Sequence, residues 1–473
     1  MQPDSTLVLE LPNAPAPAEA LSRFRHWSRP VLFQSAASRP ELGRDSFLTA
    51  DPLLTWDVSL EELHQARLAA PEAESATQTA FASIRQALQR FQAPTIPGLP
   101  PFQGGLAGLV SYGLGGLWEK LPPSGPELTP AISVGLYDWA LAWNHEEGKA
   151  WLIVQPGHGL RASTPAERAR QIEAALQAPG TPTPDRASPP TRTAGGDPFA
   201  RITGLVSNFD RPSYERAVAR VIRYIHAGDI FQANLSQRFT APAIGHAIDL
   251  YRRLAAVNPA PFAGYYDGGD FQVISASPER FLKLTGDEVE TRPIKGTRPR
   301  RPGVEADLLT RDELRESEKD RAENVMIVDL LRNDLSRVCR PGSIRVPQLC
   351  VVETYETVQH LVSEVRGRLK PGLDFFDLLA ATFPGGSITG APKIRAMEII
   401  AELEQVPRGP YCGSLFYVGV DGNADSSILI RTLTQSGGVL HFPAGGGITS
   451  QSDPPAEYEE TLHKVEGLIR ALE

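Results

Sequence analysis

Hydrophobic positions at helical spacing mark several stretches of the chain. In residues 213–227, Val218, Val221 and Ile225 fall on one face of a predicted helix, and Gly228 follows at the position of a C-terminal cap. The same pattern predicts further helices at residues 165–177, 312–335, 374–382, 393–404 and 455–472. The last of these has a strong start, with Asp453 as N-cap and Pro454 at the first helical position.

Runs typical of β-strands are interspersed with these helices. Residues 137–143 and 150–154 flank the polar segment 145–149, a pattern that predicts an antiparallel hairpin. Further strands are expected at residues 272–275, 345–354, 415–420, 427–434 and 439–442. Because strands and helices do not alternate regularly, the pattern indicates an α+β fold rather than a doubly wound parallel sheet.

One segment has almost no apolar side chains to anchor it. Residues 177–198 are rich in proline, threonine, serine and glycine, so we predict an exposed linker there. This linker separates an N-terminal region, residues 1–176, from a larger C-terminal region, residues 199–473, that carries the motifs described next.

Composition narrows the class of protein. The 473 residues include 47 basic and 56 acidic side chains, a formal net charge of −9, so nucleic acid is not the expected partner. No apolar run reaches the roughly 18 residues that span a bilayer, and the N-terminus lacks a secretory signal pattern, so no membrane association is expected. Three cysteines without C-x-x-C spacing favour a reducing compartment, and we expect a cytoplasmic protein.

A lysine stands between an isoleucine and a glycine in residues 293–297, which read Pro-Ile-Lys-Gly-Thr. Pro293 stiffens the backbone and Gly296 permits close approach, so Lys295 is suited to the wall of a pocket. A desolvated amine there loses its charge near neutral pH and becomes a nucleophile. The alternative is an exposed lysine in a turn.

Acidic residues in three places are candidates for chemistry. Glu279 follows a strand-like run, where a buried carboxyl group acts as a general acid or, alternatively, a helix simply begins. Asp320 and Glu323 stand one helical turn apart, and Glu457 and Glu460 share a face of the last helix. Carboxylates from two facing helices suit Mg²⁺, whereas each set alone is typical of a solvated helix face.

Two glycine-rich segments complete the candidates. Residues 443–449 contain three successive glycines, and residues 384–393 contain a related run that includes Ser387. Such backbone amides form a nest for a carboxylate or phosphate, or else a flexible turn. The upstream segment is not a Walker A loop, because its lysine does not directly follow the glycine.

These motifs, in this order, resemble the chorismate-utilising enzyme family, which includes anthranilate synthase and aminodeoxychorismate synthase large subunits. The likeness covers most of residues 203–473, the expected catalytic chorismate-binding part of residues 199–473. It is carried by the stretches at residues 228–238, 277–281, 322–334, 390–393 and 457–461. The resemblance implies a large α+β structure in which two antiparallel sheets face each other, flanked by helices, with the N-terminal region forming one wing.

Lys295 separates the branches of this family. Anthranilate synthases resemble this segment but carry alanine at the position, whereas aminodeoxychorismate synthases carry lysine. The resemblance therefore implies that Lys295 attacks C2 of chorismate while Glu279 protonates the departing C4 hydroxyl, and that ammonia then adds at C4 to give 4-amino-4-deoxychorismate. Anthranilate synthase component I and a non-catalytic chorismate-binding subunit are the alternatives. A salicylate or isochorismate synthase is disfavoured, because those relatives carry a lysine where this chain has Gln232.

The resemblance also implies the remaining roles. Glu323 and Glu460 would hold Mg²⁺, with Asp320 and Glu457 nearby, and His360 would lie near the ring hydroxyl. Contacts to substrate are implied for Ser387, Tyr411, Arg431, Gly445, Gly446, Gly447 and Lys464.

The family likeness has two further implications. A structural tryptophan is expected near Ser35, Pro261 and Phe262, although the N-terminal region departs from the pattern of feedback-regulated relatives. No cysteine has the Gly-x-Cys-x-Gly setting of an amidotransferase nucleophile. A separate glutamine amidotransferase subunit is therefore the expected partner and source of ammonia.

Overall fold

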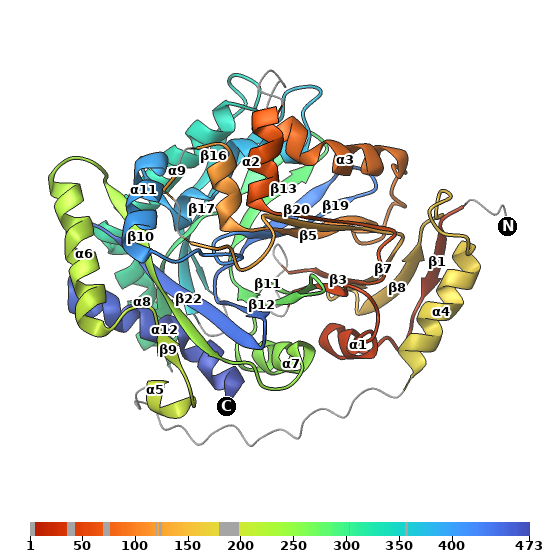
Figure 1. Cartoon of the computed structure of the whole chain (residues 1–473), viewed down its shortest axis with the longest axis horizontal. Helices are drawn as coiled ribbons and strands as arrows, with labels where there is room; N and C mark the ends of the chain where they lie inside the picture. Colours follow the sequence, from red (N-terminus) through yellow and green to blue (C-terminus); the bar gives the residue numbers. More distant parts are fainter. Residues whose placement is uncertain are drawn as a thin grey trace.

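A computed structural model of the chain describes residues 5–35, 43–69, 76–119, 121–122, 125–178, 198–301, 303–354 and 358–473. The predicted linker, residues 177–198, falls largely outside these ranges. Within them the chain forms two large antiparallel sheets with helices on their outer faces, the α+β architecture expected (Figure 1). None of the described helices is long and apolar enough to cross a membrane.

The larger sheet has twelve strands. Their order is β1 (Leu7–Glu10), β8 (Lys149–Val154), β7 (Trp139–Asn144), β3 (Asp45–Thr49), β2 (Val31–Gln34), β11 (Phe262–Asp267), β12 (Phe271–Ser277), β21 (Thr432–Ser436), β22 (Val439–Ile448), β10 (Gln232–Pro242) and β18 (Gly390–Ala391), with β9 (Val206–Ser207) also on β10.

The smaller sheet has ten strands. Their order is β15 (Ile294–Pro299), β17 (Val358–Arg368), β14 (Glu288–Thr291), β13 (Arg280–Thr285), β20 (Ala424–Ile428), β19 (Ser414–Gly419), β5 (Gly105–Val110), β6 (Ile132–Tyr137) and β4 (Leu54–Val58), with β16 (Arg345–Thr354) also on β17. Strands from before and after the linker pair within both sheets, since β2 pairs with β11 and β5 with β19.

Helices cover the outer face of each sheet, and a cluster of buried aliphatic and aromatic side chains from strands of both sheets, among them Phe102, Tyr137 and Tyr266, lies between the sheets. Against the larger sheet pack α1 (Pro17–Arg23), α4 (Pro165–Gln177), α7 (Ala247–Val257) and α12 (Pro454–Leu472). Against the smaller sheet pack α3 (Ala76–Arg90), α9 (Glu318–Ser336) and α10 (Phe375–Thr382). The other helices are α2 (Leu60–Ala69), α5 (Pro198–Arg201), α6 (Arg211–His226), α8 (Val304–Glu316), α11 (Lys393–Glu404) and two 3-10 turns, η1 (Tyr112–Leu117) and η2 (Gly386–Ile388).

Most predicted elements are confirmed. The hairpin forms between β7 and β8, and α6 ends with Gly228 in the left-handed region at φ +83°. In α12, the Asp453 side chain accepts a hydrogen bond from Ala456 N, as an N-cap does.

Three predictions of local structure were wrong. The helix expected at residues 312–335 is broken into α8 and α9, because the Ser317 side chain caps a new helix by accepting from Asp320 N. The strand expected at residues 427–434 is two strands, with Arg431 at φ +50° between them. The glycines at 445–447 lie in β22 instead of forming a loop.

Candidate active site

Lys295 lies in β15 at a bulge against β17. The register shifts between Lys295 and Thr297, and Gly296 takes φ +66°. A Cβ at Gly296 would lie 2.7 Å from Leu314 Cδ1 and 2.9 Å from Asp320 Cγ, so only glycine fits. Lys295 therefore stands in a strand against two helices, and the alternative of an exposed lysine in a turn is wrong.

The Lys295 amine is held in a desolvated position. Its Nζ donates to the backbone carbonyl of Ser387 at 3.1 Å. Burial lowers the pKa of Lys295 below its ordinary value, although the carboxylates of Glu323 and Glu279 oppose this by favouring the charged form. A lysine in this setting has a larger neutral fraction at physiological pH than an exposed one.

Glu279 lies between the end of β12 and the start of β13, so the alternative of a helix start there is wrong. The residue is only 4% exposed. Burial raises the pKa of Glu279 to about 7. A hydrogen bond from the Ser387 hydroxyl and the charge of Lys295 partly offset this rise by favouring the ionised form. Its Oε1 also accepts from Ile294 N at 3.5 Å. A carboxyl group with such a pKa donates a proton near neutrality.

Two glutamates and a lysine of α12 meet the middle of β22. A Cβ at Gly446 would lie 3.1 Å from Glu457 Oε2 and 3.3 Å from Glu460 Oε1, so both carboxylates lie close to β22 at this glycine. Lys464 Nζ binds Glu460 Oε1 at 2.6 Å and donates to the carbonyl of Gly445 at 2.8 Å. The predicted shared face of α12 is confirmed.

Glu323 of α9 joins this acidic group, and the charge of Asp320, one helical turn earlier, also acts to raise the pKa of Glu323. Burial raises the pKa of Glu323, partly offset by Lys295 and Lys319, and the charge of Glu460 adds to the rise. Burial also raises the pKa of Glu457. Asp320 is also paired with Arg298 at 2.9 Å.

The chemistry of these carboxylates fits a hard cation. Oxygen donors that share a buried site repel one another unless positive charge is supplied. For Glu460, burial opposes ionisation, but Lys464, Lys319 and Lys295 bring its pKa below the ordinary value. In the described part of the chain, no three acidic, histidine or cysteine side chains are already gathered as a metal site. Glu323, Glu457 and Glu460 are nevertheless the donors available to one.

The described contacts leave Arg431 without an acidic partner. Its left-handed backbone, φ +50°, is the break between β20 and β21, and burial lowers the pKa of its guanidinium. A buried guanidinium without a carboxylate binds a planar anion well.

Tyr411 is 4% exposed, and its ring centroid lies 5.8 Å from the guanidinium carbon of Arg408.

His360 lies in β17 beside β15. It is 2% exposed, and its Nδ1 is 2.9 Å from Thr297 Oγ1, two residues beyond Lys295. Thr297 and Lys319 are site residues that sequence reasoning missed. Their positions in the sequence could have identified them. Thr297 is the last residue of the Lys-Gly-Thr segment, and Lys319 directly precedes Asp320 of the acidic pair in α9.

Gln232 also reaches the strand that carries the glycines. It is 1% exposed, and its Nε2 lies 2.0 Å from the position of a Cβ on Gly447. Glycine at this position therefore makes room for a polar side chain of the neighbouring strand.

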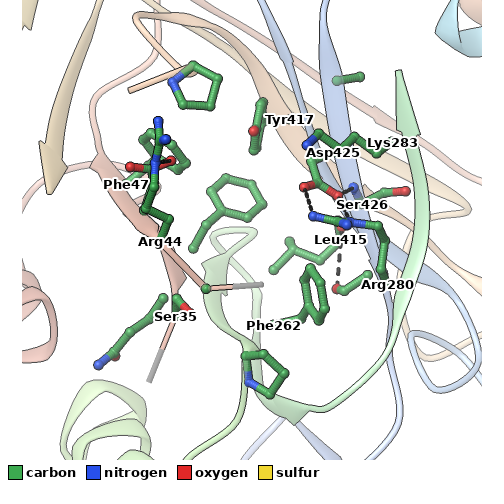
Figure 2. Close-up of a pocket in the computed structure, with 18 of the residues that line it drawn as sticks. Ser35, Arg44, Phe47, Phe262, Arg280, Lys283, Leu415, Tyr417, Asp425 and Ser426 are labelled. Carbon is green, nitrogen blue, oxygen red and sulfur yellow. Dashed lines mark hydrogen bonds and ion pairs between the residues drawn. The ribbon is translucent and has the colours of Figure 1, made fainter. Parts of the chain in front are cut away.

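Away from Lys295, a cavity of about 420 Å³ opens between the two sheets (Figure 2). The residues predicted for a tryptophan site, Ser35, Pro261 and Phe262, all line it. Aromatic walls come from Phe47 and Tyr417, whose ring centroids are 5.4 Å apart. Neither Lys295 nor Glu279 lines the cavity, so it is separate from the lysine site. Arg280, the residue after Glu279, does line it.

Comparison with known proteins places this geometry in a family. Residues 44–470 match the model of the chorismate binding enzyme family. The chain is 40% identical to aminodeoxychorismate synthase component 1 of Salmonella typhimurium over 99% of both proteins, and 42% identical to anthranilate synthase component 1 of Streptomyces coelicolor over 82% of this chain and 76% of that protein. The crystal structure of anthranilate synthase component I from Streptococcus pneumoniae superposes with a TM-score of 0.72 at 29% identity, covering 91% of this chain and 93% of that one. The chain belongs to the family of chorismate binding enzymes.

Proposed function

We propose that this enzyme aminates chorismate at C4 to give 4-amino-4-deoxychorismate. The observation that carries the proposal is the Lys295 amine, desolvated and bound to the Ser387 carbonyl, with Glu279 beside it. A neutral amine and a protonated carboxyl group in one site are what a displacement of hydroxide requires. The similarity to aminodeoxychorismate synthase component 1 over nearly the whole chain supports the same reaction.

The chemistry balances in two displacements. Lys295 Nζ forms a bond to C2, the ring double bonds shift, and the C4–O bond breaks as Glu279 gives its proton to the departing hydroxyl, which leaves as water. Ammonia then bonds to C4, the double bonds shift back, and the C2–N bond breaks to release the lysine. The proton lost by the attacking nitrogen restores Glu279. The enolpyruvyl group is retained throughout.

Arg431, Tyr411 and Lys464 would hold the substrate carboxylates. The guanidinium of Arg431, for which the described residues supply no acidic partner, suits the enolpyruvyl carboxylate. The backbone of Gly445, Gly446 and Gly447 is proposed to contact the same ligand. His360, steadied by Thr297, would lie near the ring hydroxyl.

Identification of the product tests the proposal against its nearest rival. With chorismate, ammonium and Mg²⁺, the enzyme is expected to form a non-aromatic amino product that keeps its enolpyruvyl group, detected by mass spectrometry. Fluorescent anthranilate with released pyruvate would instead assign the activity of the anthranilate synthase relatives. Chorismate left unconsumed would favour a non-catalytic subunit.

We propose that Mg²⁺ is the cofactor, held by Glu323 and Glu460 with Glu457 beside them. When bound, the ion supplies positive charge against the substrate carboxylate. Glu323→Gln is expected to raise the Mg²⁺ concentration for half-maximal activity by roughly 10-fold or more and to weaken Mg²⁺ binding measured by calorimetry to the same degree. Glu459→Gln is the matched control, because Glu459 is bonded to Arg211 at the surface. Unchanged Mg²⁺ titrations in Glu323→Gln would contradict the assignment.

A separate glutamine amidotransferase subunit is the proposed source of ammonia. The relatives are named as component 1 of their synthases, which supports a second component. Free ammonium at high pH should therefore replace glutamine in the isolated chain. The three cysteines are buried free thiols, which fits a reducing cytoplasm.

We also propose that the 420 Å³ cavity holds tryptophan as a structural ligand. Asp45 lines it with a buried Oδ1 that has no hydrogen-bond partner in the described residues, and burial raises its pKa. An α-ammonium group would satisfy this oxygen, with the indole ring against Phe47 and Tyr417.

Added tryptophan is therefore expected to raise the melting temperature of the protein. Asp45→Asn should weaken tryptophan binding by roughly 10-fold, since a charged hydrogen bond is lost. Asp287→Asn, at an exposed surface ion pair with Arg340, is the control. No shift of the wild-type melting temperature with tryptophan would exclude it as the ligand.

A further inference from the structure

The segment between α10 and α11, residues 383–392, supplies backbone carbonyls to three neighbouring groups, one of which is the Lys295 amine. The Ser387 carbonyl accepts from Lys295 Nζ at 3.1 Å. The Ile388 carbonyl accepts from Arg408 Nη1 at 3.0 Å. The Thr389 carbonyl accepts from Asn234 N at 2.7 Å. The position of the Lys295 amine therefore depends on where this segment sits.

One lysine ties the two ends of the segment together. Lys393, the first residue of α11, donates from Nζ to the Thr382 carbonyl at 2.7 Å. The same Nζ binds Asp334 Oδ2 at 2.6 Å, and the other oxygen of Asp334 accepts from Arg337 Nη2 at 2.9 Å. The side chains of Lys393 and Asp334 are 13% and 3% exposed, so the pair is shielded from water.

Helix α9 supports the same segment at a second point and also enters the site. A Cβ at Gly386 would lie 2.6 Å from Leu330 Cδ2, one turn before Asp334, so the segment packs closely on this helix. Glu323, about three turns before Asp334 in the same helix, acts on the pKa of Lys295. The helix that anchors the segment is thus also the helix that carries the candidate metal ligand.

We propose that Lys393 and Asp334 are positioning residues for the reaction. Their ion pair fixes residues 383–392 so that the Ser387 carbonyl holds the Lys295 amine in its attacking position. Neither residue takes part in the chemistry. This inference rests on the proposed function, because it requires Lys295 to be the nucleophile.

The test compares three variants of the full chain with chorismate, ammonium and Mg²⁺. Lys393→Met is expected to lower kcat by roughly 10- to 100-fold, because a displacement of about 1 Å at the reacting atoms has effects of that size. KM for chorismate should change much less than kcat, since the carboxylate contacts are proposed for Arg431, Tyr411 and Lys464, which lie outside the segment. Lys393→Arg should recover most of kcat, because a guanidinium can still donate to Asp334 and to the Thr382 carbonyl.

Lys393→Met leaves the buried Asp334 carboxylate with only the partly exposed Arg337 as a cationic partner, which destabilises the fold. The double variant Lys393→Met/Asp334→Leu removes both charges, and it should fold while remaining as slow as the single variant. Without ammonia, it should also form the Lys295–chorismate adduct more slowly by mass spectrometry. Wild-type kcat and adduct formation in the folded double variant would overturn the positioning role, as would equal kcat in Lys393→Arg and Lys393→Met.

The outcome for Lys295→Ala separates this inference from the function beneath it. Full turnover in that variant would refute the proposed function itself. An inactive Lys295→Ala together with a fully active double variant would refute only the role of the ion pair.

Discussion

Lys295→Ala is expected to lower the rate of chorismate amination by on the order of 10³-fold or more, because the variant lacks the proposed nucleophile. KM for chorismate should change little, since the carboxylate contacts are proposed for Arg431, Tyr411 and Lys464. The measurement is steady-state formation of 4-amino-4-deoxychorismate with saturating ammonium and Mg²⁺. The variant should fold, because truncation removes a single hydrogen bond, to the Ser387 carbonyl.

Two matched variants show whether the effect comes from nucleophilicity. Lys295→Arg keeps a positive charge but supplies no neutral amine, so it should be as inactive as alanine. Lys149→Ala removes an exposed lysine that is paired with Glu147 and should retain full activity. In wild-type protein mixed with chorismate and no ammonia, a peptide containing Lys295 should carry the mass of chorismate less one water. A wild-type rate in Lys295→Ala would refute the covalent role.

Local elements of the fold were predictable where a short-range signal decides them. The hairpin of β7 and β8 follows from two apolar runs around a polar turn, and α12 follows from its cap at Asp453 and its apolar spacing. Where the prediction failed, the deciding interaction was small. A single hydroxyl, that of Ser317, starts a new helix inside an otherwise continuous helical pattern.

Other features depended on contacts that no local pattern contains. Residues 445–447 have the composition of a loop, yet they form a strand because side chains of α12 and β10 occupy the space beside them. The break at Arg431 likewise leaves no mark in the apolar pattern, since Ile428 to Thr434 is apolar enough for one strand. Tertiary packing overrides propensity at both places.

The candidate site was predictable as a set of residues but not as a geometry. Spacing placed Glu457 and Glu460 on one helix face, whereas their meeting with Glu323, more than 130 positions earlier, required the fold. The resemblance to a known family suggested that meeting, and physical reasoning alone left solvated helix faces as the alternative. Asp320, which the resemblance placed near the metal ligands, acts on the pKa of Glu323 and is also bonded to Arg298.

Glu279→Gln is expected to lower kcat by roughly 10²- to 10⁴-fold, the usual contribution of a general acid. Because burial raises the pKa of Glu279 to about 7, the wild-type kcat/KM should fall as pH rises above that value and the carboxyl group loses its proton. In Glu279→Gln this descending limb should disappear, and the residual rate should rise with pH as Lys295 loses its proton. A descending limb near pH 7 that persists in the variant would assign the acid to another group.

Glu279→Gln is expected to lower activity but to raise the free energy of unfolding at high pH. A carboxyl group whose pKa is raised on folding binds its proton more tightly in the folded state, so its contribution is fully present below the ordinary value of 4.5 and is lost as pH rises through about 7. Glu279→Gln avoids the burial of this charge, and the free energy of unfolding at pH 8 should exceed that of wild type by up to about 3 kcal/mol. At pH 4.5 or below, the gain should vanish. Urea unfolding at pH 4.5 and pH 8 measures the difference, and an equal effect at both values would show that this carboxyl group is not kept protonated by burial.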